Sequence, residues 1–207
     1  MDIPKALNLG SGKDFRDDCI NVDVLERWSP DIVADLGAPF PGEDQGFRTE
    51  RFGLVRLEPA SIDRILAIDL LEHVPDVGLL MRSCLDLLRP DGVLQALVPY
   101  DLSFGAWQDP THVRAFNERS WLYYTDWFWY MGWTEARFEL DKLEYGLSDI
   151  GHELHAAGTD GPTLLRTPRA VDSMSVELRK VGLTAADRAA LARHVPQARQ
   201  RPVPVAQ

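Results

Sequence analysis

The sequence has little of what marks secreted, membrane or metal-rich proteins. Its two cysteines, Cys19 and Cys84, lie in apolar runs and lack the spacing of metal ligands. His152 and His155 lie three residues apart, but no third ligand accompanies them, so the sequence predicts no metal site. There is no run of about 18 apolar residues, and no apolar signal core follows Met1. We therefore expect buried free thiols, no membrane-spanning segment and a cytoplasmic protein.

Signatures of phosphate binding are missing as well. The sequence contains no Gly-Lys-Ser/Thr phosphate loop and no internal repeat. The formal net charge is −10, and the acidic excess lies in the body of the chain, because residues 166–207 hold 8 basic and 3 acidic groups. An acidic body repels a phosphate backbone, which argues against a nucleic-acid substrate. We interpret the basic end as a solvated helix over 184–194 and a disordered tail over 196–207.

What is present is the composition of a globular α/β protein. The 207 residues are 45% apolar and 26% charged, which is enough chain for a substantial core. Apolar runs alternate with amphipathic ones, as is typical of a parallel sheet with covering helices. Apolar residues at helical spacing predict a helix over 77–89. We predict strands at 5–9, 19–24, 31–35, 63–68 and 93–99, with later β runs at 137–145 and 174–181.

This order of elements predicts a Rossmann-like, doubly wound sheet of about seven strands, mostly parallel with an antiparallel edge. The segment 36–60, which contains several prolines and glycines, is predicted to be a long connection with a small hairpin near 52–57. We expect one domain over 1–182, which includes an aromatic segment over 101–135. A C-terminal helix and tail would follow over 183–207.

The most informative stretch is Ala-Leu-Asn-Leu-Gly-Ser-Gly at residues 6–12, followed by a second apolar run that contains Asp23 near its end. Gly10 and Gly12 carry no Cβ, so the backbone can turn sharply and approach a ligand closely. A carboxylate at position 23 can accept hydrogen bonds from both hydroxyls of a ribose. Strand, glycine turn, strand and acid together predict a site for an adenosine-containing cofactor.

The spacing within this stretch distinguishes between cofactors. A dinucleotide fingerprint has a third glycine at the position where this chain has Phe15. Asp23 follows Gly10 by 13 residues, against roughly 20 in the dinucleotide pattern, so the intervening helix must be very short or absent. These departures favour a cofactor that has an adenosine but no phosphates, such as S-adenosylmethionine, over a nicotinamide cofactor.

Polar residues also end the next two predicted strands. Asp35 closes the third strand, and Asp69 closes the fourth and is followed by Leu-Leu-Glu-His73. The carboxyl ends of parallel strands meet at one edge of a sheet, where ligands bind. We therefore expect the ends of the first four strands to converge on one crevice.

With these segments in this order, the chain resembles the class I S-adenosylmethionine-dependent methyltransferases that act on small molecules. The resemblance covers about residues 5–100. It implies the predicted fold, S-adenosylmethionine as the cofactor and methyl transfer as the activity. The segments that carry it are 8–12, 21–24, 34–36, 68–74 and 88–94.

The resemblance also implies roles within this site. The turn at 10–12 would border the methionine part of the cofactor, and Asp23 would hold the ribose. Residues 35–36 would flank the adenine, and residues 69–70 would line the sulfonium side. The implied cofactor-binding residues are Asn8, Leu9, Gly10, Ser11, Gly12, Asp23, Val24, Asp35, Leu36, Asp69, Leu70 and His73.

A second concentration of signal is aromatic, because five of the six tryptophans fall within residues 107–133. We predict an aromatic helix over 118–131, capped by Asn117 and carrying two aromatic stripes. One stripe must pack on the sheet, and the other leaves apolar surface to be covered. Two uses of that surface stay open: a wall for the methyl acceptor, or a homodimer interface through the helix. The residues predicted to bind the acceptor are Tyr100, Trp107, Arg114 and Trp121.

The segment 107–116 follows the fifth strand and is therefore expected to lie over the methyl donor. Methyl transfer to a hydroxyl requires an acceptor held at near-attack distance and removal of its proton. His112 is the best-placed general base, because an imidazole titrates near neutral pH. Asp109 could orient His112, and Arg114 could bind an acidic group on the acceptor. The alternative is a structural histidine bonded to the loop backbone.

The function predicted from these observations is methyl transfer from S-adenosylmethionine to an oxygen or nitrogen of a small molecule, such as a sugar or a secondary metabolite. The Asn-Pro-Pro-Tyr motif of adenine methyltransferases is absent, which adds to the case against a nucleic-acid substrate. Two alternatives stay open. One is a catalytically inactive protein that keeps the fold for binding or assembly, and the other is an enzyme with a nicotinamide cofactor.

Overall fold

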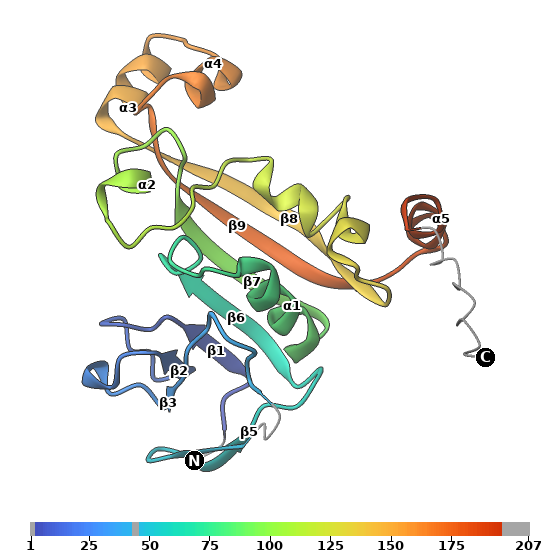
Figure 1. Ribbon diagram of the computed structural model, residues 1–207. Helices are drawn as coiled ribbons and strands as arrows, with labels where there is room; N and C mark the ends of the chain where they lie inside the picture. Colours follow the sequence, from blue (N-terminus) through green and yellow to red (C-terminus); the bar gives the residue numbers. More distant parts are fainter. Residues whose placement is uncertain (1–2, 43–45, 196–207) are drawn as a thin grey trace, which may run out of the picture.

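Seven strands form one mixed sheet in the computed structural model, which describes residues 3–42 and 46–195 (Figure 1). The strand order is β3-β2-β1-β6-β7-β9-β8. The first five strands in this order run parallel, and β9 is antiparallel to both β7 and β8. The predicted sheet with its antiparallel edge is therefore confirmed. The strands are β1 (Ala6–Leu9), β2 (Ile20–Asp23), β3 (Ile32–Val33), β6 (Ile62–Ile68), β7 (Leu88–Pro99), β8 (Ala136–Leu147) and β9 (Val171–Gly182).

The third strand is much shorter than the predicted span 31–35. Only Ile32 and Val33 pair with β2, although the N–H of Ala34 still donates to the carbonyl of Asp23 at 3.0 Å. The carboxylate of Asp35 then accepts the N–H of Gly37 at 2.8 Å, which turns the chain away from the sheet.

One contiguous apolar core lies against the sheet and includes buried residues from all seven of its strands. Helix α1 (Val77–Leu87) packs on it and begins where the Asp76 carboxylate accepts the N–H of Leu79 at 2.9 Å. The helix is two residues shorter than the predicted 77–89, because β7 starts at Leu88. The buried residues of α1 are Val77, Leu80, Met81, Cys84, Leu85 and Leu87, in the predicted helical spacing.

The predicted aromatic helix over 118–131 is wrong. The segment forms two short 3-10 turns, η2 (Ser120–Tyr123) and η3 (Phe128–Met131). Between them the Thr125 hydroxyl donates to the carbonyl of Trp121 at 3.1 Å, and the N–H of Trp127 donates to the carbonyl of Leu122 at 2.8 Å. Aromatic and Thr residues have modest helix propensity, so side-chain and turn hydrogen bonds prevail over a continuous helix.

The two predicted aromatic stripes nevertheless exist. Trp121, Tyr124 and Phe128 are buried in the core. The exposed stripe consists of Tyr123, Trp127 and Tyr130, whose side chains contact one another edge to face. The predicted homodimer through this segment stays a prediction.

The remaining elements lie at the periphery of the sheet. The hairpin of β4 (Gly46–Thr49) and β5 (Gly53–Arg56) begins earlier than the predicted 52–57. In Figure 1 it lies at one end of the molecule, with α3 and α4 at the other end and α5 projecting beside β8. None of the helices within the described residues is long and apolar enough to cross a membrane. The other short elements are η1 (Glu26–Trp28), α2 (Gly105–Gln108), α3 (Asp149–Ala156), α4 (Gly161–Arg166) and α5 (Ala185–His194).

Predictions for the C-terminal part of the chain have two outcomes. The helix expected over 184–194 is confirmed as α5, with Thr184 as its cap. The expected disordered tail, 196–207, lies outside the described residues. His152 and His155 lie on α3, in the connection between β8 and β9.

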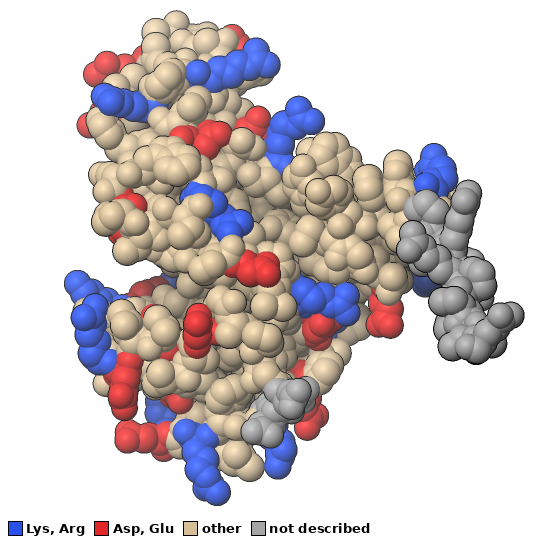
Figure 2. All heavy atoms as spheres, viewed as in Figure 1, with Lys and Arg blue, Asp and Glu red and all other residues tan. Residues whose placement is uncertain are grey.

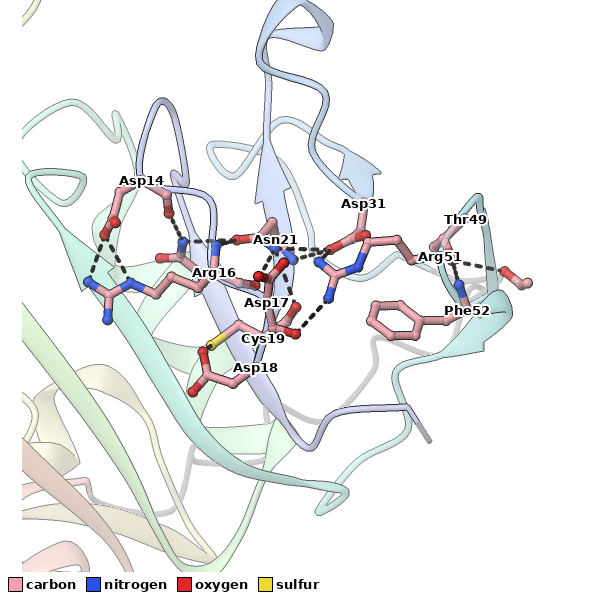
Figure 3. Close-up of polar contacts among 12 residues, drawn as sticks. Asp14, Arg16, Asp17, Asp18, Cys19, Asn21, Asp31, Thr49, Arg51 and Phe52 are labelled. Atoms are coloured by element: carbon pink, nitrogen blue, oxygen red, sulfur yellow. Dashed lines mark hydrogen bonds and ion pairs between the residues drawn. The ribbon is translucent and has the colours of Figure 1, made fainter. Parts of the chain in front are cut away.

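The connection from β1 to β2 contains no helix among its described residues, as its length predicts, and a polar network holds it instead (Figure 3). The amide oxygen of Asn21 accepts from the side chain of Asn8 at 3.1 Å and from the N–H of Arg16 at 2.9 Å. The carboxylate of Asp31 accepts the N–H of Asn21 at 2.8 Å and pairs with Arg51 at 3.2 Å. These bonds fix the loop that carries the two predicted site glycines.

Candidate functional site

A cavity of about 140 Å³ lies at the carboxyl ends of β1, β2, β3 and β6. In a parallel sheet this edge is where ligands bind. Seven of the residues predicted to bind the cofactor line it, together with Ala34, Gly37, Val74 and Pro75. The seven are Gly10, Asp23, Val24, Asp35, Leu36, Leu70 and His73.

A larger hollow of about 550 Å³ lies between the β3 edge and the β4–β5 hairpin. Charged and polar residues form most of its wall, and none of the predicted cofactor residues lines it. Basic and acidic side chains are interspersed on the face of the molecule in Figure 2. The described residues of that face therefore present no continuous basic surface to a phosphate backbone.

Gly10 provides close backbone approach at the cavity. Its φ of +65° is in the left-handed region that glycine tolerates. A Cβ at this position would lie 2.8 Å from Cδ1 of Leu70, which is too close for any side chain to fit without displacing Leu70. The Gly10 backbone therefore packs directly against the Leu70 side chain, and both residues line the cavity.

Asp23 is 7% exposed and sits at the end of β2. One carboxylate oxygen accepts the N–H of Gly12 at 2.8 Å, and the other accepts the N–H of Leu25 at 2.8 Å. A carboxylate oxygen has two lone pairs, so each can accept a further hydrogen bond from the cavity. The two backbone bonds fix the carboxylate in position, and the remaining lone pairs suit a pair of ribose hydroxyls.

The other predicted cofactor residues are close to the cavity but do not line it. Asn8 holds the β1–β2 loop through Asp14 and Asn21, and Leu9 is buried in the core. Ser11 is buried, and its hydroxyl has no hydrogen-bond partner among the described residues. Gly12 acts through its N–H, which holds Asp23.

Asp69 begins the loop after β6 in a left-handed conformation, with φ of +46°. Aspartate is among the few residues that adopt this conformation readily. Desolvation by the surrounding loops raises the pKa of Asp69, against the opposing effect of the positive charges that His73 and His112 can carry. The loop places Glu72 and His73 beside the cavity mouth.

The loops that follow β6 and β7 meet because these strands are parallel neighbours. The N–H of Val113 donates to the carbonyl of Glu72 at 2.9 Å, which joins the two loops. The rings of His73 and His112 then lie edge to face, with their centroids 4.6 Å apart. His112, from the segment predicted to lie over the methyl donor, therefore reaches a residue that lines the cavity.

Hydrogen bonds assign the proton positions of both imidazoles. His112 Nδ1 lies 3.1 Å from the carbonyl of Ala106, which can only accept, so Nδ1 carries the proton. The Thr111 hydroxyl donates to the Asp109 carboxylate at 2.6 Å, so His73 Nδ1, 2.9 Å away, must donate to Thr111. In its neutral form each ring therefore has a lone pair on Nε2.

Asp109 does not orient His112, contrary to the prediction. Its carboxylate accepts from the N–H and the hydroxyl of Thr111, and these bonds lower its pKa. Through Thr111 it orients His73, while the carbonyl of Ala106 orients His112. The hydrogen bond between Thr111 and Asp109 sets the partner of Asp109, and the spacing of these residues in the sequence does not indicate it.

Glu72 is a member of the site that sequence reasoning did not single out. Its side chain is 1% exposed, and neither carboxylate oxygen has a hydrogen-bond partner among the described residues. Desolvation by burial raises the pKa of Glu72 to about 7. The Glu-His pair was visible in the sequence, but the burial of the glutamate depends on the loop after β7.

The four residues predicted to bind the acceptor do not lie together. Trp107 is 65% exposed, on the same loop as His112, whereas Trp121 is 1% exposed and stacks on Phe116 in the core. The Tyr100 hydroxyl is already bonded to Glu118 at 2.8 Å. The guanidinium of Arg114 donates to the carbonyl of Pro75 beside the cavity. Of these four, Trp107 and Arg114 remain available near the site.

Part of the chain is similar in sequence to proteins named as methyltransferases. No protein-family model matches the chain. A Mycolicibacterium smegmatis protein named "Probable S-adenosylmethionine-dependent methyltransferase" is 28% identical over 121 residues, which are 54% of this chain and 46% of that protein. A ubiquinone biosynthesis O-methyltransferase of Neisseria meningitidis serogroup C is 39% identical over 41 residues, which are 20% of this chain and 17% of that protein. The chain thus matches less than half the length of these curated relatives.

The fold has solved counterparts. A crystal structure of an S-adenosylmethionine-dependent methyltransferase from Archaeoglobus fulgidus superposes with a TM-score of 0.53 at 14% identity, covering 86% of each chain. Together with the strand order, this likeness shows the class I methyltransferase fold that the sequence segments imply.

Proposed function

We propose that this chain, which has the class I methyltransferase fold, binds S-adenosylmethionine in the cavity at the ends of β1, β2, β3 and β6 and transfers its methyl group to a small molecule. The observation that carries the proposal is the position of the Asp23 carboxylate in that cavity. It is held by two backbone N–H groups and has lone pairs to spare for a ribose. The sequence similarity to named methyltransferases supports the same activity.

The residues around the cavity fit this cofactor. S-adenosylmethionine supplies a methyl group on a positively charged sulfur. Gly10 leaves room for a close backbone approach where a Cβ would displace Leu70. Leu36 and Val74 give the cavity apolar walls suited to an adenine, and the Asp35 carboxylate lies in the same wall. Asp23 matches the two vicinal hydroxyls of the ribose.

The methyl acceptor would lie on the side of the cavity that carries the two imidazoles. An oxygen or nitrogen there would be held near the sulfonium, and His112 would take its proton at Nε2. The Ala106 carbonyl keeps His112 in the tautomer that this role requires. The exposed ring of Trp107 supports binding of an acceptor with apolar surface, and Arg114 lies within reach of an acidic group.

The first experiment is calorimetric titration with S-adenosylhomocysteine, the demethylated product. We expect micromolar binding to the wild-type protein. Asp23→Asn keeps the size of the side chain and loses its charge, so affinity should fall by roughly 10- to 100-fold, the effect of a lost charge-assisted hydrogen bond. Asp63→Asn is the matched control, because Asp63 pairs with Arg89 on the surface.

The outcomes separate the candidate functions. Binding that is lost in Asp23→Asn and kept in Asp63→Asn supports the proposal, provided that near-ultraviolet circular dichroism shows both variants folded. No binding by the wild-type protein contradicts it and favours the alternative of a binding or assembly protein with the same fold. Binding of a nicotinamide cofactor in place of S-adenosylhomocysteine would favour the second alternative.

A further inference from the structure

A cluster of three potential metal ligands lies beside the proposed cofactor cavity. Glu72, His73 and His112 each offer one ligand atom, and these atoms lie within 4.8 Å of one another. Within the described residues this is the only group of three or more His, Cys, Asp or Glu side chains with that geometry. Two imidazole nitrogens and one carboxylate oxygen form a donor set that suits zinc and neighbouring divalent transition metals.

The buried glutamate is the strongest sign that a ligand belongs here. Glu72 is 1% exposed, yet both of its carboxylate oxygens lack a partner among the described residues. Burial of a carboxylate without hydrogen bonds costs free energy, and buried polar groups are nearly always paired. No ion pair within 4.0 Å joins Glu72 to either imidazole in the described part of the chain. A cation between the three side chains would supply the missing partner.

The bonds behind the imidazoles also suit a metal site. Metal-bound histidines usually donate the N–H of the second ring nitrogen to a carbonyl or to a carboxylate relay, which fixes the tautomer. His112 donates to the carbonyl of Ala106, and His73 donates to Thr111, which in turn bonds Asp109. Each ring is therefore held with Nε2 free to bind a cation.

We propose that Glu72, His73 and His112 bind a divalent transition-metal cation that holds the oxygen of a hydroxyl acceptor next to the methyl donor. A tetrahedral site with bonds of about 2.1 Å separates its ligand atoms by roughly 3.4 Å. The three ligand atoms lie within 4.8 Å of one another, so they need to approach one another by up to about 1.4 Å. Three protein ligands leave a coordination position open for the acceptor. His73 also lines the cofactor cavity, which places this position at the cavity mouth.

The role of the cation in catalysis rests on the proposed function, but its binding does not. The cation would lower the pKa of the acceptor hydroxyl, whose proton leaves to solvent. The oxygen then bonds to the methyl carbon, the carbon–sulfur bond breaks, and its electron pair stays on sulfur. The products are a methyl ether and S-adenosylhomocysteine. In this arrangement His112 is a ligand, and the cation replaces it in activating the acceptor.

The test measures metal binding directly, with Zn²⁺ by calorimetry and Co²⁺ by its visible absorption, on full-length protein first treated with a chelator. We expect about one equivalent of either metal to bind, with Mg²⁺ much weaker. Glu72→Gln and His112→Gln should each weaken binding by roughly tenfold or more. His152→Gln, which removes a histidine on α3, is the matched control and should bind like the wild type.

Each result either supports or overturns the proposal. It is overturned if the wild type does not bind micromolar Zn²⁺ or Co²⁺, if Glu72→Gln and His112→Gln bind unchanged, or if His152→Gln loses binding. Glu72→Gln keeps the volume of the side chain and removes a buried charge, so it should stay folded. S-adenosylhomocysteine titrated into the same metal-free samples should still bind, which separates failure of the metal site from failure of the proposed function.

Discussion

At the scale of single residues, the site depends on side chains that hydrogen bonds to backbone groups or to other side chains hold in place before any ligand binds. Asp23 is fixed by two N–H groups, and each imidazole is fixed by one acceptor. Such pre-positioning is what binding and catalytic sites need, because a side chain that is already ordered loses little entropy when a ligand binds. The exception is Glu72, which is ordered by burial alone.

Gly10 gives the sharpest prediction at this scale. Gly10→Ala should lower the free energy of unfolding by at least about 1–2 kcal/mol, the cost of a left-handed alanine. It should also weaken S-adenosylhomocysteine binding by roughly tenfold or more, because the new Cβ displaces Leu70 from the cavity wall. Chemical denaturation and calorimetry measure the two effects.

Gly132→Ala is the matched control for Gly10→Ala. Gly132 has a similar φ of +71°, but no atom lies within 4 Å of the position of its Cβ. This variant should therefore lose stability without losing affinity. Equal affinity losses in the two variants would show that Leu70 has no part in binding.

At the scale of elements, loops rather than helices complete the site. A polar network replaces a helix between β1 and β2, and two 3-10 turns replace the predicted aromatic helix. Helix α5 has no fully buried residue; it is attached through the partly buried Leu191, which packs against the core, and through contacts at its two ends. At its start Thr184 and Asp187 form a capping box. At its end the ring of His194 stacks on that of Trp129, with the ring centroids 4.1 Å apart.

Asp187 is predicted to anchor α5 to the sheet. Its carboxylate accepts the N–H of Thr184 at 2.9 Å and pairs with Arg137 of β8 at 3.1 Å. Asp187→Ala should therefore lower the free energy of unfolding by about 1–2 kcal/mol, as measured by urea denaturation. Arg188→Ala, at an exposed position of the same helix, should have almost no effect.

The contribution of Asp187 should also depend on pH. Desolvation acts to raise its pKa, but the bonds from Thr184 and Arg137 outweigh it and lower the pKa overall. A carboxyl whose pKa is lower in the folded than in the unfolded protein stabilises the fold at pH values above its unfolded pKa. This stabilisation is lost as the pH falls through the folded pKa. The difference between wild type and Asp187→Ala should therefore shrink in acid. An unchanged difference would argue against an ionic contribution.

At the scale of the whole molecule, the packing of the core fixes the carboxyl edge of the sheet, where the proposed site lies. The core continues under all seven strands, so the strand ends are fixed relative to one another. The loops that leave those ends carry polar and charged groups, including the buried Glu72 carboxylate, which has no hydrogen-bond partner among the described residues. The cost of that carboxylate should be measurable in the stability of the whole protein.

The free energy of unfolding of the metal-free protein should therefore fall as pH rises from about 4.5 to about 7. Glu72 has a pKa of about 7 when folded, above its usual value near 4.5, so the folded state binds more protons in this window. The stabilisation from protonated Glu72 is complete below about pH 4.5 and lost by about pH 7, which lowers the free energy of unfolding by about 3 kcal/mol. The measurement is denaturant unfolding at several pH values with a chelator present.

Glu72→Gln should remove this pH dependence, because the amide does not titrate. Glu58→Gln, at an exposed position, should leave it unchanged and serves as the control. Identical pH profiles for the wild type and Glu72→Gln would mean that the carboxylate is not desolvated in solution.

The sequence by itself determined the sheet and the proposed cofactor site. These features are visible in the sequence because each depends on residues that are close together along the chain. They are the apolar runs of the strands, the glycines of the turns and the acidic residues at the strand ends. Gly10, Asp23 and Asp35 were identified in this way, and they line one cavity. The short β1–β2 connection followed from spacing alone.

Only the tertiary structure decided what meets above the strand ends. The aromatic segment formed turns, Trp121 and Tyr100 entered the core, and Asp109 bonded Thr111 instead of His112. Glu72 and His112 are 40 residues apart, and they meet because β6 and β7 are parallel neighbours whose loops share one edge. The burial of a side chain and its hydrogen bonds to a distant loop depend on how the chain packs. Such contacts leave no periodic pattern in a single sequence, so they cannot be predicted from it.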